Sequence, residues 1–249
     1  MSEYLVVIPL LPLAAQGREI EFAIEGWRRH FKEPHRIVIV GGGLPAFRGE
    51  DITCVESPRV LERPNQYHQH LDYVPCFRAV RRAFPDSEGF IFVADDCYAV
   101  NDFDIHDVRF LKMLSPNFNF DPNSPNGWRR DKMKTKALLL SEGLPTHNFT
   151  THLPIWFDWD KWEALVSKHR MWEESYVIED LYFNTYCPDR IPFQLCPQDN
   201  LKCGVYTTHP DPAELADAFR RKIWITNSPD GYTKELVTLL DEHFFKKNL

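Results

Sequence analysis

The stretch that decides the fold runs from Glu88 to Asp104 and reads EGFIFVADDCYAVNDFD. Its apolar run, Phe90 to Ala94, is typical of a buried strand, and it ends at two adjacent carboxylates, Asp95 and Asp96. Two neighbouring carboxylates repel each other, so the pKa of one rises unless a cation or hydrogen-bond donors compensate. Two explanations fit the pair: a divalent metal ion bound by the carboxylates compensates their repulsion, or one aspartate caps the turn or helix that follows.

Short apolar runs alternate with helical patterns through the first hundred residues. Strands are predicted at 4–10 (YLVVIPL), 35–43 (HRIVIVGGG), 52–57 (ITCVES) and 89–94 (GFIFVA). Helices are predicted at 18–31 and at 65–84, where Pro75 is expected to kink or split the helix. Strands separated by helices indicate a mainly parallel sheet with helices on both faces. The predicted fold class is therefore α/β.

Beyond Asp104 the pattern is less regular. The segment 115–128 is rich in Pro, Asn and Ser and predicts a long loop, which in compact domains is often a functional lid. Further elements are expected as a strand followed by a turn at 147–157, a strand at 193–197, helices at 129–143, 158–169 and 175–187, and one or two amphipathic helices in the tail. Neither repeats nor a clear linker is visible, so we predict one domain over residues 1–249.

Composition excludes several classes of protein. The chain has 249 residues, of which 43% are hydrophobic, and a net charge of -7, which argues against nucleic acid as a partner. No apolar run is long enough for a membrane span. The six cysteines form no C-x-x-C pair, so a zinc site has little support. The N-terminus lacks a basic region before its apolar run, which indicates a core strand rather than a signal peptide and predicts a cytoplasmic protein.

Three of the strand motifs, taken in order, resemble the GT-A type of glycosyltransferase. They are VVIPL (6–10), RIVIVGG (36–42) and FIFVADDCY (90–98). The resemblance implies a Rossmann-like half over 1–104 that binds a nucleotide-sugar through a D-x-D motif and Mn²⁺ or Mg²⁺, and an acceptor-binding half over 105–249. It implies Asp96 as a metal ligand and Asp95 as a second ligand or a ribose contact. Ala94 and Cys97 depart from the strict motif, so the two aspartates could exchange roles.

Two downstream segments support the same resemblance. YVIEDLYFNTY (176–186) is similar to the E-D element at the start of a helix in such enzymes, which implies Asp180 as the general base, with Glu179 beside it, and inversion at the anomeric carbon. The alternative is a packed helix with solvated acids. GVYTTHPDP (204–212) contains His209, which the resemblance implies as a further metal ligand and which is equally explained as a surface histidine.

Contacts to donor and acceptor are predicted from position along the chain. The candidate donor-binding residues are Arg18, Gly41, Arg63, Asn65 and Asp72. A tight turn is the alternative for Gly41, and each of the others could equally be a surface residue. His152 and Trp156 are the candidate acceptor-binding residues, and packing of the histidine against the tryptophan is the alternative. The basic segment 129–136 could close over the diphosphate, although a solvated helix face is the favoured interpretation.

The sequence thus predicts a metal-dependent glycosyltransferase that moves a sugar from a nucleotide-sugar donor to a glycan or other hydroxyl acceptor, in bacterial-type polysaccharide or glycan synthesis. A looser likeness to Stealth-type sugar-phosphate transferases rests on the segment 18–47, on the same FIFVADDCY block and on THLP (151–154), taken in this order. Those enzymes would move a phosphoryl group on the same fold. A non-catalytic nucleotide- or glycan-binding module is the third hypothesis.

Overall fold

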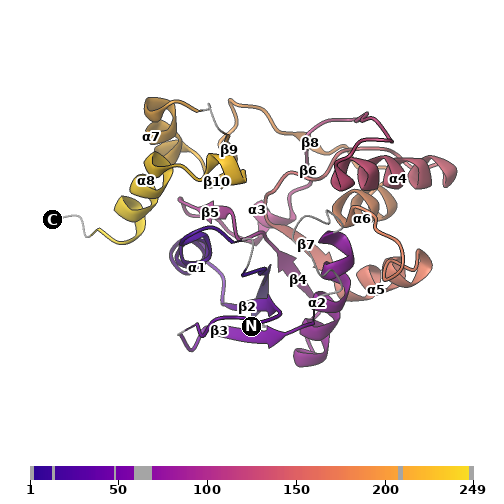
Figure 1. Cartoon of the computed structure of the whole chain (residues 1–249), viewed down its shortest axis with the longest axis horizontal. Helices are drawn as coiled ribbons and strands as arrows, with labels where there is room; N and C mark the ends of the chain where they lie inside the picture. The colour runs from indigo at the N-terminus through magenta and orange to yellow at the C-terminus, as the bar shows by residue number, and fades with distance from the viewer. Residues whose placement is uncertain (1–2, 13–14, 48, 59–68, 207–209, 247–249) are drawn as a thin grey trace.

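The computed structural model describes residues 3–12, 15–47, 49–58, 69–206 and 210–246. Its centre is a five-stranded sheet in the order β3-β2-β1-β4-β7. The strands are β1 (Tyr4–Pro9), β2 (His35–Gly41), β3 (Ile52–Glu56), β4 (Gly89–Phe92) and β7 (Ile155–Asp158). All neighbouring strands pair in parallel except β4 and β7, which pair antiparallel. The predicted α/β class with a mixed, mainly parallel sheet is confirmed (Figure 1).

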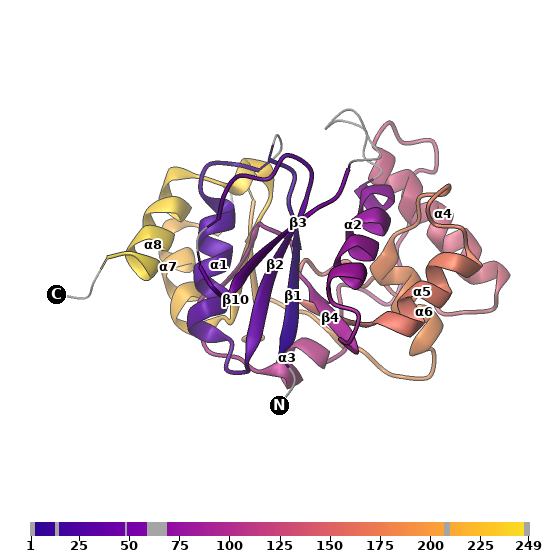
Figure 2. The same cartoon turned by 90° about the horizontal axis from the view of Figure 1, so that it is seen from below.

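Both faces of this sheet are buried, which explains why its strands are almost continuously apolar. Successive side chains of a strand point to opposite faces, so Leu5 and Val7 belong to one core and Val6 and Ile8 to the other. The first core is closed by α2 (Gln69–Ala83), α5 (Trp159–Lys168) and α6 (Ile178–Tyr186). The second is closed by α1 (Glu19–His30) (Figure 2).

A second sheet extends the molecule on the side of α1. It has three strands in the order β5-β10-β9, with bounds β5 (Cys97–Ala99), β9 (Lys202–Val205) and β10 (Trp224–Asn227). The helices α7 (Pro212–Arg221) and α8 (Lys234–Phe244) pack on it, and a 3₁₀ turn, η1 (Pro229–Gly231), precedes α8 (Figure 2). Residues of α1 near the N-terminus and of α7 and α8 near the C-terminus therefore pack into one core around this second sheet.

The remaining elements are α3 (Ile105–Arg109), β6 (Lys112–Met113), α4 (Gly127–Ser141) and β8 (Phe193–Gln194), and β6 pairs in parallel with β8. Of these, α3 packs against the second core through Ile105 and Val108, and α4 lies beside α6, to which Lys132 and Asp180 join it. In the part of the chain that the structure describes, no helix has the length and apolarity needed to cross a bilayer.

The structure differs from the sequence-based predictions in several elements and in the burial of one lysine. The tail contains a strand, β10, that the search for amphipathic helices missed. Residues 147–154 are irregular rather than a strand, because side chains such as Asn148 hydrogen-bond to local backbone groups, as in its contact with the N–H of Thr150 at 3.2 Å. Pro75 lies inside α2 and does not split it. Lys132, which was assigned to a solvated helix face, is fully buried.

Candidate functional site

The order of the strands creates a topological switch point between β1 and β4. The chain passes from β1 to β2 and β3 on one side and then returns to place β4 on the other side of β1. In open α/β sheets, ligands bind in the crevice outside the carboxyl ends of the strands at such a point. Asp95 and Asp96 lie there, in the turn between β4 of the central sheet and β5 of the second sheet.

A cavity of about 170 Å³ opens beside the two aspartates. Its walls combine the end of β4, one residue of α2, the loop before β7, and the beginnings of α4 and α6. The lining residues are Tyr73, Phe92, Val93, Ala94, Asp95, Asp96, Trp128, Phe149, Thr150, Thr151, His152, Leu153, Ile155 and Glu179. Carboxylates predicted from two distant motifs, 90–98 and 176–186, therefore meet in one cavity, which we call the carboxylate cavity.

Burial dominates the electrostatics of the aspartate pair. It raises the pKa of Asp95 to about 7, with Asp96 and Glu19 adding repulsion. It also raises the pKa of Asp96 to about 7, helped by Glu19 and opposed by the Lys202 ammonium. Both carboxylates therefore lie in surroundings that disfavour their charge.

A third carboxylate, Glu19, stands close enough to act on this pair, and sequence reasoning missed it. Glu19 is only 5% exposed at the start of α1, where its Oε1 accepts a hydrogen bond from Asn227 at 2.8 Å. Asn227 also accepts from the Tyr98 hydroxyl at 2.6 Å, and its backbone N–H donates to the Asp96 carbonyl at 3.2 Å. This network fixes the turn that carries the aspartates. No sequence signal could have shown this network, because it forms only where the pairing of β10 with β5 places Asn227 next to Glu19.

The donor atoms at this turn fit a hard divalent cation. The Oδ1 atom of Asp96 is buried and has no hydrogen-bond partner, which is costly for a carboxylate oxygen unless a cation meets it. Within the described ranges no group of three His, Cys, Asp or Glu side chains is close enough to hold a metal ion. Mg²⁺ needs only one or two protein carboxylates when substrate phosphates and water complete its coordination. His209, the predicted further ligand, lies outside the described residues.

Glu179 and Asp180 are adjacent in sequence but occupy different environments. Glu179 lines the carboxylate cavity, and its Oε2 atom is buried without a hydrogen-bond partner, 3.8 Å from His70 Nδ1. Burial raises the pKa of Glu179 to about 7. A carboxylate with such a pKa, facing a cavity, is suited to accept a proton near neutral pH.

Asp180 has both carboxylate oxygens engaged and is fully buried. Oδ2 pairs with the ammonium of Lys132 from α4, and Oδ1 accepts the N–H of Phe149 at 2.7 Å. Lys132 also donates to Asn148 at 2.8 Å and to Thr150 at 3.2 Å. Burial raises the pKa of Asp180 and lowers that of Lys132, each against the pull of its partner. The pair joins α4, α6 and the loop before β7, and so holds one wall of the carboxylate cavity in place.

His152 lines the carboxylate cavity, and Lys202 contacts the loop that carries it. His152 adopts a left-handed backbone conformation with φ of 57°, which is uncommon for a residue other than glycine. Part of His152 is exposed to solvent. Protein atoms nevertheless surround its ring closely, and this burial, together with the charges of Lys202 and Lys132, lowers the pKa of His152 to about 4. Lys202 donates to the Thr151 carbonyl at 2.6 Å and thereby ties β9 to the same loop.

Of the predicted donor contacts, the three that the structure describes do not line the carboxylate cavity. Arg18 forms ion pairs with Glu21 at 2.6 Å and with Asp241 of α8 at 2.5 Å, so its guanidinium faces the second layer. Gly41 ends β2, where a Cβ would stand 2.2 Å from the Leu10 carbonyl oxygen. Asp72 is partly buried in the first turn of α2. Arg63 and Asn65 lie outside the described residues.

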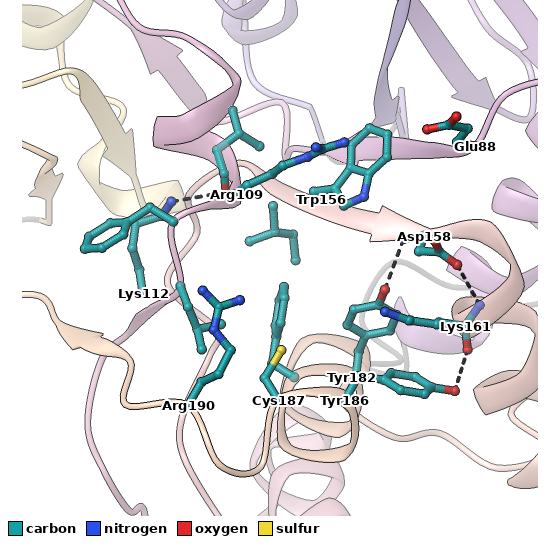
Figure 3. A pocket seen from close by; sticks show the side chains of 15 residues that line it. Glu88, Arg109, Lys112, Trp156, Asp158, Lys161, Tyr182, Tyr186, Cys187 and Arg190 are labelled. Carbon is teal, nitrogen blue, oxygen red and sulfur yellow. Dashed lines mark hydrogen bonds between the residues drawn. The ribbon is translucent and has the colours of Figure 1, made fainter.

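Trp156 belongs to a second, larger cavity of about 380 Å³. The Trp156 side chain points to the opposite face of β7 from those of Ile155 and Phe157, and the Arg109 guanidinium lies 4.4 Å from the centroid of the Trp156 ring (Figure 3). The structure thus brings together Asp95, Asp96, Glu179 and His152, and separates Trp156 from them. Besides Glu19, sequence reasoning missed Tyr73 and Trp128, whose presence in the cavity depends on how α2 and α4 pack.

Solved structures with a similar fold exist, but their sequences are only 11–12% identical to this chain. No protein-family model and no curated protein sequence matches the chain. The apo structure of the WbbM bifunctional glycosyltransferase is similar at a TM-score of 0.53 and 12% identity, covering 99% of this chain and 50% of that one. An active-site mutant of LgtC has a TM-score of 0.47 at 12% identity, covering 98% of this chain and 97% of that one. GlyE from Streptococcus pneumoniae TIGR4 has a TM-score of 0.44 at 11% identity, covering 99% and 61%.

The match to WbbM carries the fold assignment. The chain has the α/β fold of GT-A-type glycosyltransferases, as the order of its strand motifs predicted. The activity itself has to be argued from the residues of the site.

Proposed function

We propose that this protein is a glycosyltransferase that moves a sugar from a nucleotide-sugar donor to the hydroxyl group of a glycan or similar acceptor, with Mn²⁺ or Mg²⁺ held by Asp95 and Asp96. The observation that carries the proposal is the position of this pair at the switch point of a GT-A-type sheet, with Asp96 Oδ1 buried and unpartnered. Glycan or polysaccharide synthesis is the setting in which such an activity would serve.

The bound metal ion would neutralise charge on the departing diphosphate as a Lewis acid. The aspartates at the carboxyl end of β4 would hold the ion, and Glu19, kept in place by Asn227, adds negative charge beside them. Tyr73 and Trp128 supply aromatic walls against which the ring parts of a donor can pack.

For the proton-accepting role, the surroundings favour Glu179 over Asp180. Glu179 lines the carboxylate cavity and its Oε2 atom accepts no hydrogen bond, whereas both oxygens of Asp180 are engaged by Lys132 and Phe149. A base that acts on the face opposite the diphosphate implies inversion at the anomeric carbon. NMR of the product sets the stereochemistry: a retained configuration would remove this role from Glu179.

The test of the function is a thermal-shift screen with a panel of nucleotide-sugars, with and without Mn²⁺. We expect one donor class to raise the melting temperature only when Mn²⁺ is present. Asp96→Asn should abolish that rise, whereas Asp189→Asn, which changes an exposed aspartate, should leave it intact. Failure of every nucleotide-sugar in both conditions would contradict the proposal.

Product analysis separates glycosyl transfer from the other hypotheses. Glycosyl transfer releases a nucleoside diphosphate, whereas a sugar-phosphate transferase releases the monophosphate and leaves phosphorus in the product, which phosphorus NMR detects. A non-catalytic module would bind its ligand equally well without metal and would keep binding it after Asp96→Asn.

A further inference from the structure

The larger cavity lies at the other end of β7 from the aspartates. It is bounded by β7, by the segment after α3, and by α6, with Glu88 and Asp158 together on one side (Figure 3). Of the described residues, Ile155 alone lines both cavities, and neither Asp95 nor Asp96 belongs to this one. At about 380 Å³ it has the size of a small-molecule site. The proposed glycosyl transfer does not use it.

The charge in this cavity is positive. Its lining includes the cationic side chains of Arg109, Lys112, Lys161 and Arg190 but only two carboxylates, Glu88 and Asp158. No ion pair within the described ranges engages Arg109, Lys161 or Arg190, and Figure 3 shows Arg109 lying flat along Trp156. Arginine side chains left without anions in a concave surface are suited to bind phosphate, because the planar guanidinium can bond two of its oxygens.

Lys112 adds a buried cation without a carboxylate partner. It is 4% exposed, and its ammonium donates to the backbone carbonyls of Asp107 and Val108, the latter at 3.3 Å. No carboxylate lies within ion-pair distance of it in the described part of the chain. Burial lowers the pKa of Lys112 to about 7, against the pull of Asp107. An anion in the cavity would supply the charge partner that this ammonium lacks.

The rim of the cavity next to Arg190 is apolar. Among the described residues eight large hydrophobic side chains are exposed, and three of them are Phe110, Ile191 and Phe193. Phe110 lines the cavity, its ring lies 5.6 Å from that of Phe193, and Ile191, which is 97% exposed, follows Arg190 in sequence. Apolar side chains gathered at the mouth of a cationic cavity favour a ligand that carries an apolar group beside its charge.

We propose that this cavity binds an amphiphilic phosphate, with the phosphate group between Arg109, Lys112 and Arg190 and an alkyl chain over Phe110, Ile191 and Phe193. A phosphate monoester carries a charge of roughly -1.5 to -2 near pH 7, which matches the surplus of positive side chains. The residues of this cavity support such binding whether or not the protein transfers a sugar.

The test is isothermal titration calorimetry with three probes below their micelle-forming concentrations. Octyl phosphate carries both groups, inorganic phosphate only the charge, and octyl glucoside only the chain. We expect octyl phosphate to bind at least about tenfold more tightly than inorganic phosphate, because part of its chain leaves water, and octyl glucoside not to bind measurably.

Variants divide the two contributions. The double change Arg109→Met and Arg190→Met should weaken octyl phosphate binding at least about tenfold. Ile191→Ser should reduce the affinity for octyl phosphate to near that for inorganic phosphate, and full exposure of this side chain leaves folding unaffected. Matched changes of exposed residues elsewhere, Arg82→Met and Leu140→Ser, should alter neither affinity. Circular dichroism melts confirm that each variant is folded.

Three results would overturn the proposal. Equal affinities for octyl phosphate and inorganic phosphate, or no binding of either, would remove the amphiphile site. Binding of octyl glucoside as tight as that of octyl phosphate would show an apolar patch without anion recognition. Loss of octyl phosphate binding in Asp96→Asn but not in the arginine variant would place the ligand in the carboxylate cavity.

Discussion

At the scale of single residues, burial moves acids and bases toward the same pKa from opposite directions. It raises the pKa of Asp96 and of Glu179 to about 7, and it lowers the pKa of Lys112 to about 7. The cause is the same in each case, because loss of water disfavours whichever form carries charge. Residues that titrate near neutral pH therefore line both cavities.

The buried pair of Lys132 and Asp180 should be a structural requirement. We expect Lys132→Met to lower the free energy of unfolding by about 3–5 kcal/mol, because it leaves the Asp180 carboxylate buried without its ammonium. Asp180→Asn should also destabilise, and the double variant should lose less than the sum of the two. Urea denaturation of the wild type, the two single variants and the double variant measures these free energies of unfolding. Strictly additive losses would contradict the coupling, and Lys134→Met, in an exposed pair with Glu174, should change little.

The pKa of Lys112 predicts how stability depends on pH. The folded protein loses the Lys112 proton near pH 7, whereas the unfolded chain keeps it up to about pH 10.5, so stability should rise with pH between these values. Compared with Lys112→Met, the wild type should gain about 2 kcal/mol in the free energy of unfolding from pH 7 to 9. Urea denaturation at the two pH values measures the difference. Parallel pH profiles of the two proteins would show that Lys112 is not the group responsible.

Which charged residues are buried could not be read from the sequence. Asp95 and Asp96 were predicted at a site because they directly follow an apolar strand, which is a local signal. Lys132 sits in a basic segment typical of an exposed helix, and only the packing of α4 on α6 buries it. Glu19 likewise enters the site through contact with β10, which is remote in sequence.

At the scale of elements, the carboxyl ends of β1 and β2 approach each other unusually closely at Gly41. A Cβ there would stand 2.2 Å from the Leu10 carbonyl oxygen, so we expect Gly41→Ala to lower the free energy of unfolding by about 2–4 kcal/mol. Gly43→Ala is the matched control. Its Cβ would meet nothing within 4 Å, and only its φ of +67° is unfavourable, which costs roughly 1–2 kcal/mol. Chemical denaturation compares the two, and an equal or smaller loss at Gly41 would contradict the steric argument.

The elements that were predicted correctly are those whose pattern is complete within the segment. The strands β1, β2 and β4 contain contiguous apolar runs, and α1 has a clear apolar stripe. The strand β10 was missed because its four residues lie between two amphipathic helices and are defined by pairing with β5 and β9. The prediction of a strand at 147–154 was wrong because its threonines favour strands, whereas the side chains of its own Asn148 and of Asp180 in α6 engage its backbone N–H groups instead.

At the scale of the whole molecule, the predicted halves are interleaved rather than separate. The fifth strand of the central sheet, β7, comes from the second half, while β5 of the first half pairs with β10 near the C-terminus. The carboxylate cavity draws its walls from both halves, since Asp95 and Glu179 face it together. A donor bound there would touch side chains from β4, α2, α4 and α6, so binding and folding should be coupled.

This interleaving predicts that the chain unfolds as one cooperative unit. Leu240, in the core under α8, and Leu165, in the core under α5, are both buried, and replacing either with alanine should cost about 2–5 kcal/mol. Because strand pairing crosses between the halves, both variants should shift the same single transition, seen alike by tryptophan fluorescence and far-ultraviolet circular dichroism. Leu140→Ala, at an exposed position, should shift it little. Two separable transitions, of which Leu240→Ala moves only one, would instead show that the layer of β5, β9 and β10 unfolds independently of the central sheet.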